Sequence, residues 1–325
     1  MWRALFTERG LPLRVLDRRE EVAEIAVQKR GTLWLDLQDP TPEEVALLTD
    51  AFKLDPLAVE DIVTEIHHPK IDDYGDYLYI AVHGVIAGRK LGGMHTCELD
   101  VILSDHALIT HGPNEMRSVP ETWDRALKTK TLPGGSLVET LQAILATQAS
   151  HHVEVVEGLQ MELSRVEAEL MEKTGPRLKP PVKQVYLIKS DLARLRIILG
   201  AQREVLHRLG RGDFRVIPAR LHMHFRDVYD DLYRATEMTD LLRDMANSAL
   251  DAYLNVAANR TSEIVKVLTI ISCFIMPMSL ITSWFGMNFR HLSGLEWRHG
   301  ELFVLGVCGL VTISLAAFFR RKGWI

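Results

Sequence analysis

Acidic side chains recur at every seventh position in the last third of the sequence. This acidic row consists of Asp230, Glu237, Asp244 and Asp251. Rings of carboxylates at a pore mouth attract cations, so the row favours cation chemistry. The same register continues through small or apolar residues, namely Ala258, Val265, Ser272, Ser279 and Gly286. A companion row, offset by four positions, consists of Asn255, Ser262, Thr269, Met276 and Ser283.

The spacing of these rows indicates how they are used. A strict seven-residue repeat keeps one seam of a helix turned toward one partner along a left-handed supercoil. Two interpretations follow: close helix packing through small residues, which is common in bilayers, or a water-filled pore shared by several identical helices. One helix with a single polar stripe cannot enclose a channel, so the pore interpretation requires an oligomer.

An amide, Asn288, stands just beyond the row, in the stretch SWFGMNFRHL at 283–292. Mg²⁺ holds its water shell tightly, and side-chain amides accept hydrogen bonds from such waters without removing them. A ring of Asn288 side chains could therefore select a hydrated divalent cation by accepting hydrogen bonds from its water shell. Deeper in, Met276, Leu268 and Val265 would form apolar constrictions, which close a pore by dewetting.

The elements that must position these residues are long helices. No glycine or proline lies between Pro218 and Pro277, so the sequence predicts one stalk helix over 218–285, roughly 100 Å long. Its end and the segment 302–319 are uncharged and close to the length that spans a bilayer. We expect membrane spans at about 265–285 and 302–319, joined by an outer loop at 286–301. Cations that flank the spans, including the tail 320–325, place both termini in the cytoplasm.

The rest of the chain predicts a cytoplasmic α/β domain at 1–133 and a helical hairpin at 134–210. Strand-like stretches occur at 32–39, 77–88 and 97–112. Thr41 and Pro42 mark a helix start, and Ser136 with Glu139 reads as a capping box. The fold class is therefore an α+β membrane protein, in which a long stalk helix continues into the first of two C-terminal transmembrane helices.

Composition excludes several function classes. The formal net charge is −5, with 25% charged residues, which argues against nucleic acid as a partner. Three cysteines give no disulfide framework. The pairs His151-His152 and His222-x-His224 are poor chelates on a helix and are interpreted as surface or packing residues. No motif marks a nucleophile with its base, so neither an enzyme nor an organic cofactor is expected.

The segment KVLTIISCFIMPMSLITSWFGMNF, followed by a short loop, a second span and RRKGWI, resembles the CorA family of magnesium transport channels. Gly286-Met287-Asn288 matches the family's signature tripeptide. Segments such as LWLDLQDPTPEE, HHPKIDDYGDYLYI and FRDVYDDL extend the resemblance over essentially the whole chain.

The resemblance implies a homopentamer in the inner membrane that moves hydrated Mg²⁺, with cobalt and nickel as further candidates, and that has membrane lipid around it. Asn288 would form the outer selectivity ring, with Gly286 and Met287 shaping the turn. Asp227 would bind regulatory Mg²⁺ between neighbouring subunits. The pore and its gate would be lined by Ser279, Met276, Ser272, Leu268 and Val265, with Asp251 at the cytoplasmic mouth.

Three departures from the family pattern qualify this expectation. HLSG at 291–294 replaces the loop sequence MPE, so an acid is missing there. The stretch 85–93, VIAGRKLGG, has no acid to partner Asp227, so regulatory binding is either weaker or uses other carboxylates. Ser279 replaces a threonine and keeps the hydroxyl. The alternatives are a ZntB-like zinc transporter and, in another class, a non-conducting membrane-anchored sensor of divalent ions.

Overall fold

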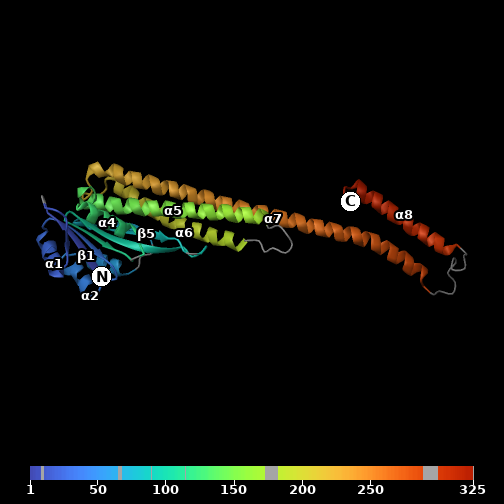
Figure 1. The fold of residues 1–325 in the computed structure, drawn as a ribbon, viewed down its shortest axis with the longest axis horizontal. Helices are drawn as coiled ribbons and strands as arrows, with labels where there is room; N and C mark the ends of the chain where they lie inside the picture. The colour runs from blue at the N-terminus through green and yellow to red at the C-terminus, as the bar shows by residue number, and fades with distance from the viewer. Residues whose placement is uncertain are drawn as a thin grey trace. The chain divides into compact units, whose positions relative to one another are not determined.

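A computed structural model describes residues 1–8, 11–64, 68–88, 90–113, 115–172, 182–287 and 299–324, and its ribbon is shown in Figure 1. The chain separates into two compact units, Met1–Leu250 and Asp251–Ile325.

The first unit contains a mixed sheet of seven described strands, in the order β2-β1-β3-β7-β6-β5-β4. Strands β3 and β7 run parallel, with Leu35 opposite Ile109. All other neighbouring pairs are antiparallel. The strands are β1 (Trp2–Thr7), β2 (Arg14–Leu16), β3 (Thr32–Leu37), β4 (Lys70–Asp73), β5 (Tyr77–Ile86), β6 (His95–Ser104) and β7 (Ala107–His111).

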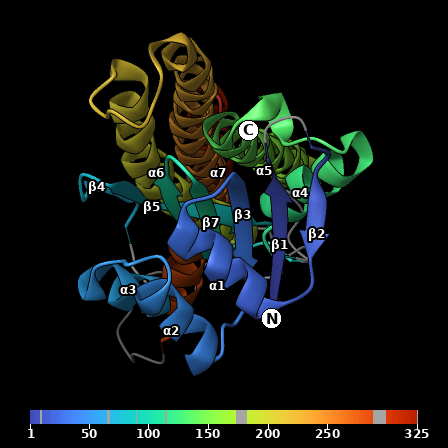
Figure 2. The ribbon, with the colours of Figure 1, turned by 90° about the vertical axis from the view of Figure 1, so that its left-hand side faces the viewer.

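Three short helices cover one face of this sheet, as the end-on view of Figure 2 shows. They are α1 (Arg19–Gln28), α2 (Pro42–Asp50) and α3 (Pro56–Val63). Their apolar side chains form one core with alternate residues of the strands, including Leu33, Leu35 and Tyr79. The helix α2 starts where the sequence predicts, with Thr41 as its N-cap, and Thr41 also forms a capping box with Glu44.

Longer helices cover the other face: α4 (Ser118–Thr129), α5 (Leu137–Glu172) and α6 (Val182–Arg211). Trp34 of β3 meets Trp123 of α4 edge to face, with ring centroids 4.8 Å apart. Two short 3₁₀ turns, η1 (Pro133–Gly135) and η2 (Ala219–Leu221), precede α5 and α7. Because both faces of the sheet are covered, β5 and β6 are buried along nearly their whole length.

The helix α7 (His222–Phe285) begins in the first unit, where it packs on α6. Arg196 of α6 lies 2.8 Å from Asp240 of α7, and the Arg203 guanidinium lies 4.9 Å from the centre of the Tyr233 ring. These contacts, with buried residues such as Leu232 and Leu242, fix which face of α7 points into the first unit.

The second unit consists of the later part of α7 and of α8 (Gly300–Arg321). Both helices are long and apolar enough to cross a membrane. The most apolar stretch of α7 has no buried residue, and that of α8 is 6% buried. A core helix of a soluble protein would hide such a surface, so this exposure agrees with two membrane-spanning helices.

The fold class predicted from the sequence is confirmed, and two local features differ from prediction. The stretch 97–112 forms two strands, β6 and β7, because the chain turns at Asp105 and His106 between them. At the start of α5, the Ser136 hydroxyl accepts from the Glu139 backbone N–H and donates to the Glu139 carboxylate. This pairing replaces the full capping box that the sequence predicts.

Candidate functional site

The acidic row lies on the surface of α7. Asp230, Glu237 and Asp244 are exposed, while the residues buried in the first unit lie on another side of the helix. Asp230 and Glu237 form no side-chain ion pair with another described residue, and Asp244 has only its neighbour Arg243 at 4.0 Å. These carboxylates are therefore free to act on mobile cations.

The side chains of the row are exposed in the second unit as well. Asp251, Ser272 and Ser279 are exposed, as are the apolar members that the sequence assigns to a gate. The exposed fractions of these side chains are 54% for Val265, 63% for Leu268 and 71% for Met276. The predicted pore-lining residues thus share one accessible side of α7.

A different side of α7 contacts α8. Phe274 packs on Phe319, and Phe319 also contacts Trp324, with ring centroids 5.7 Å apart. Lys266 lies 3.5 Å from the carbonyl oxygen of Gly323. Because Ser272 and Ser279 stay exposed, packing against α8 does not account for the row of small residues within the described part of the chain.

The signature tripeptide is only partly described. Gly286 and Met287 follow the last turn of α7 and are exposed, and the Gly286 N–H donates to the Thr282 carbonyl at 3.0 Å. Asn288 and the loop sequence 291–294 lie outside the described residues, so the predicted selectivity ring stays a prediction.

Asp227, the predicted regulatory residue, is exposed on α7 and makes no ion pair with another described residue. Within the described ranges, no group of three or more His, Cys, Asp or Glu side chains is placed to hold a metal ion in one chain. A regulatory ion at Asp227 would therefore need ligands from elsewhere, as the expected site between subunits does.

One buried carboxylate near the 85–93 stretch escaped sequence analysis. Asp191 of α6 is 3% exposed and accepts a 2.9 Å hydrogen bond from the Gly92 N–H. Burial raises the pKa of this carboxyl. Its sequence signal is its place on an apolar stripe between Ile188 and Leu195, where a leucine would be ordinary.

Buried polar groups also join strands of the sheet to one another and to α5. Asp36 accepts from Arg3 at 2.8 Å and from the Thr110 hydroxyl at 2.7 Å, yet burial still raises its pKa. His152 of α5 is fully buried, with its Nε2 3.0 Å from the His83 carbonyl oxygen. The packing interpretation of this histidine is confirmed, and these groups serve the fold rather than an ion path.

The geometry therefore comprises an α/β domain, the helix α7 with its accessible acidic and small-residue row, and the helix α8. Both helices contain an apolar stretch long enough to cross a membrane. The family described as CorA-like Mg²⁺ transporter protein matches residues 29–321. The chain belongs to this CorA-like family. CorA-like proteins are divalent-cation transporters of the membrane and not enzymes. The two apolar helices are therefore assigned as the membrane-spanning part of this chain.

Individual relatives match over most of their length. The chain is 26% identical to the putative metal ion transporter YfjQ of Bacillus subtilis, covering 99% of this chain and 97% of the relative. It is also 26% identical to the cobalt/magnesium transport protein CorA of Thermotoga maritima, covering 84% of this chain and 78% of the relative.

Solved structures share the CorA fold. The complete CorA magnesium transporter of Methanocaldococcus jannaschii superposes with a TM-score of 0.85 at 20% identity, covering 100% of this chain and 99% of that structure. The ZntB cytoplasmic domain of Vibrio parahaemolyticus gives a TM-score of 0.63 at 13% identity, covering 80% of this chain and 98% of that domain. At these identities the likeness concerns the fold alone.

Proposed function

We propose that this chain is the subunit of a homopentameric channel that carries hydrated Mg²⁺ passively across the inner membrane, with cobalt and nickel as further cargoes. The relatives in Thermotoga maritima and Methanocaldococcus jannaschii are named as cobalt/magnesium transport proteins. The single observation that carries the proposal is the exposed row on α7. Five copies turned inward would place this row around one axis.

The proposed path begins at the outer end of α7, where a ring of Asn288 carboxamides contacts the hydrated ion. Gly286 and Met287 shape the turn that presents the ring. Hydroxyl and thioether groups follow along the pore, and an apolar gate lies below them. These lining positions are Ser279, Met276, Ser272, Leu268 and Val265, with Asp251 at the cytoplasmic mouth.

Orientation follows from the charges at the ends of the spans. Arg320, Arg321 and Lys322 end α8, and Arg260 and Lys266 lie at the matching end of the first span. Positive charges gather on the cytoplasmic side of a membrane. Both termini and the first unit are therefore placed in the cytoplasm, with 286–301 outside.

Regulation is assigned to intracellular Mg²⁺ bound between neighbouring stalks at Asp227. An ion that bridges subunits only in the closed state shifts the population toward that state, and its release permits opening. The 85–93 stretch contains no acidic residue that could help Asp227 to bind the ion. We therefore propose weak binding at Asp227, or completion of the site by other carboxylates.

Flux measurements on the full-length protein in liposomes test this function. Mg²⁺ entry that follows its own gradient and is unchanged by a pH gradient supports the channel. Zn²⁺ entry that exceeds Mg²⁺ entry and depends on a pH gradient would instead favour the ZntB-like alternative. If correctly assembled protein carried neither ion, the result would favour the alternative of a non-conducting, membrane-anchored sensor of divalent ions.

A further inference from the structure

The chain folds back on itself where α8 ends. Gly323 adopts a left-handed backbone conformation with a φ of 68°, which glycine reaches without strain because it has no Cβ atom. The Trp324 N–H donates to the Phe319 carbonyl at 2.9 Å. The Gly323 N–H donates to the Arg320 carbonyl at 3.2 Å. These two hydrogen bonds form the Schellman motif that commonly ends a helix, and they hold the Trp324 ring against that of Phe319.

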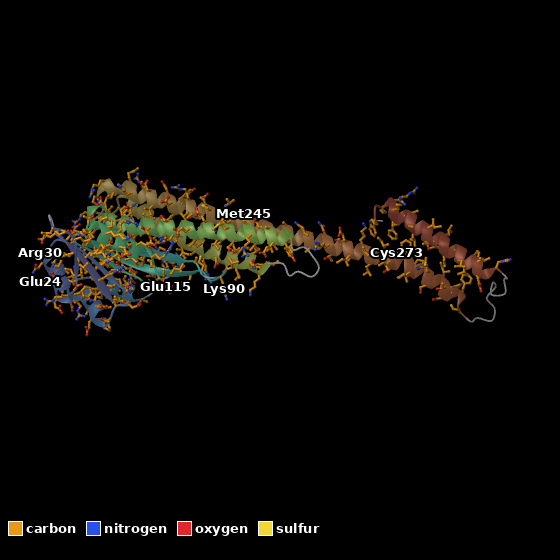
Figure 3. The ribbon with its side chains drawn as sticks, in the orientation of Figure 1. Glu24, Arg30, Lys90, Glu115, Met245 and Cys273 are labelled. Carbon is orange, nitrogen blue, oxygen red and sulfur yellow. The ribbon has the colours of Figure 1, made fainter. Side chains whose placement is uncertain are left out.

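This turn brings cationic side chains of two helices together. Lys266 of α7 reaches the Trp324 ring, with its Nζ 5.9 Å from the ring centre. At about 100° per residue, Arg320 and Lys322 project on either side of Phe319, whose ring packs on α7. Figure 3 shows side-chain nitrogen atoms gathered at this end of α8. The basic cluster is defined as Lys266, Arg320 and Lys322.

The basic cluster has no acidic partner within the described part of the chain. None of its three side chains forms an ion pair there, and Arg320 and Lys322 are exposed. The single acid in the described stretches 260–270 and 318–324 is Glu263. The ammonium group of Lys266 has three donors and meets one printed acceptor, the Gly323 carbonyl oxygen at 3.5 Å. The cluster therefore keeps charge and hydrogen-bond donors available for an anion.

The surroundings of the basic cluster favour a lipid over a soluble anion. Both helices are assigned as membrane-spanning, and the cluster lies at the end of the uncharged stretch of each. Tryptophan side chains prefer the level of the lipid headgroups, and the Trp324 ring lies beside the Lys266 ammonium group. Basic pockets between transmembrane helices on the cytoplasmic side bind anionic headgroups.

We propose that the basic cluster binds the phosphate of an anionic phospholipid. The Arg320 guanidinium offers paired N–H donors that match two phosphate oxygens, and Lys266 and Lys322 add positive charge. The cluster belongs to the side of α7 that packs against α8, and not to the exposed row of small residues. Its place in the cytoplasmic leaflet rests on the orientation proposed above. Lipid binding itself is measured without ion flux, so its failure and that of the channel are distinguishable.

Native mass spectrometry of the full-length, delipidated protein tests the lipid preference. The probes are dioleoyl phosphatidylglycerol and dioleoyl phosphatidylcholine, which share their acyl chains and differ in net charge. We expect saturable binding of phosphatidylglycerol, one per chain, and at least about fivefold weaker binding of phosphatidylcholine. Equal affinities for the two lipids would overturn the proposal. Displacement of phosphatidylglycerol by glycerol 3-phosphate would also overturn it, because the cluster would then bind a soluble phosphate.

Neutral variants connect the binding to the named groups. Arg320→Gln and Lys266→Gln should each weaken phosphatidylglycerol binding about fivefold, whereas Lys266→Arg keeps the charge and should keep the binding. The control Arg321→Gln removes the same charge at about 200° from Phe319 on α8 and should bind like the parent protein. Arg260→Gln is the matching control on α7, where Arg260 is exposed.

The pattern among these variants decides the assignment. Equal weakening by all four neutral variants would show general charge attraction without a defined site, and unchanged affinity in all four would exclude the basic cluster. Lys266 and Arg320 belong to different helices, so either variant tests the proposal if the other fails to assemble. Size in solution reports assembly.

Discussion

Phe319 of α8 packs its ring against Phe274 of α7, with centroids 5.9 Å apart and planes inclined by 45°. Phe319 is only 4% exposed, although most of its helix is accessible. This contact identifies the side of α7 that packs against α8 of the same chain. The row that contains Ser272 and Ser279 lies on the remaining side and is not covered by α8.

Replacement of Phe319 by alanine should loosen the second unit without changing ion preference. Loss of a buried phenyl ring costs on the order of 3 kcal/mol in well-packed cores. We expect a lower melting temperature of the detergent-solubilised protein and less flux in liposomes, with the same Mg²⁺ to Zn²⁺ ratio. Leu310→Ala, at an exposed position on the same helix, is the control. An altered ion ratio would show that Phe319 acts on the pore itself.

Replacement of Asn288 by alanine should remove the side chain of the proposed outer selectivity ring. We expect Mg²⁺ uptake to fall by at least about tenfold, or about 1.4 kcal/mol in ion binding, because the hydrated ion loses its hydrogen-bond acceptors. The oligomer should remain assembled, since the contacts of α7 and α8 are unchanged, and its size in solution is the control. Uptake at the parental rate would remove Asn288 from the mechanism.

Neutralising Asp227 should weaken closure by Mg²⁺. Limited proteolysis with and without millimolar Mg²⁺ reports closure as protection of the α7 backbone. We expect Asp227→Asn to lose most of this protection, because a bridging ion would lose its carboxylate. The control Asp231→Asn removes a carboxylate that is paired with Arg234 at 2.9 Å. This variant should keep the protection by Mg²⁺. Equal protection in both variants would place regulation elsewhere.

His152 should make the first unit sensitive to acid. Burial lowers the pKa of this histidine to about 4, whereas an unfolded histidine titrates near 6.5. Between these values the unfolded state binds the additional proton. Folding stability from this residue is therefore complete above about pH 6.5 and is lost as the pH falls toward 4, by at most about 3 kcal/mol.

The comparison that isolates His152 is the melting temperature at pH 7 and at pH 5. His152→Gln keeps a donor for the His83 carbonyl but does not titrate in this range. We expect the parent protein to lose more stability on acidification than the variant. Parallel losses in the two proteins would mean that other groups dominate the acid response.

Periodicity and single-residue signals predicted the helical part of the fold well. An uninterrupted stretch without glycine or proline predicted α7, and Thr41 with Pro42 located the start of α2. The sheet order was beyond such reasoning, because no local pattern reveals that β3 lies beside β7. The buried position of Asp191 was equally hidden, since this residue looks like an ordinary polar residue until the elements that bury it are in place.

The parallel seam between Leu33–Leu37 and Ala107–His111 has a kinetic consequence. It joins two antiparallel halves of the sheet whose strands are distant in sequence, so this pairing is a long-range contact. Contacts of long sequence separation carry a large entropic barrier and slow folding. During synthesis, the β1–β3 half emerges first, and the edge of β3 that pairs with β7 has no partner strand until β7 leaves the ribosome.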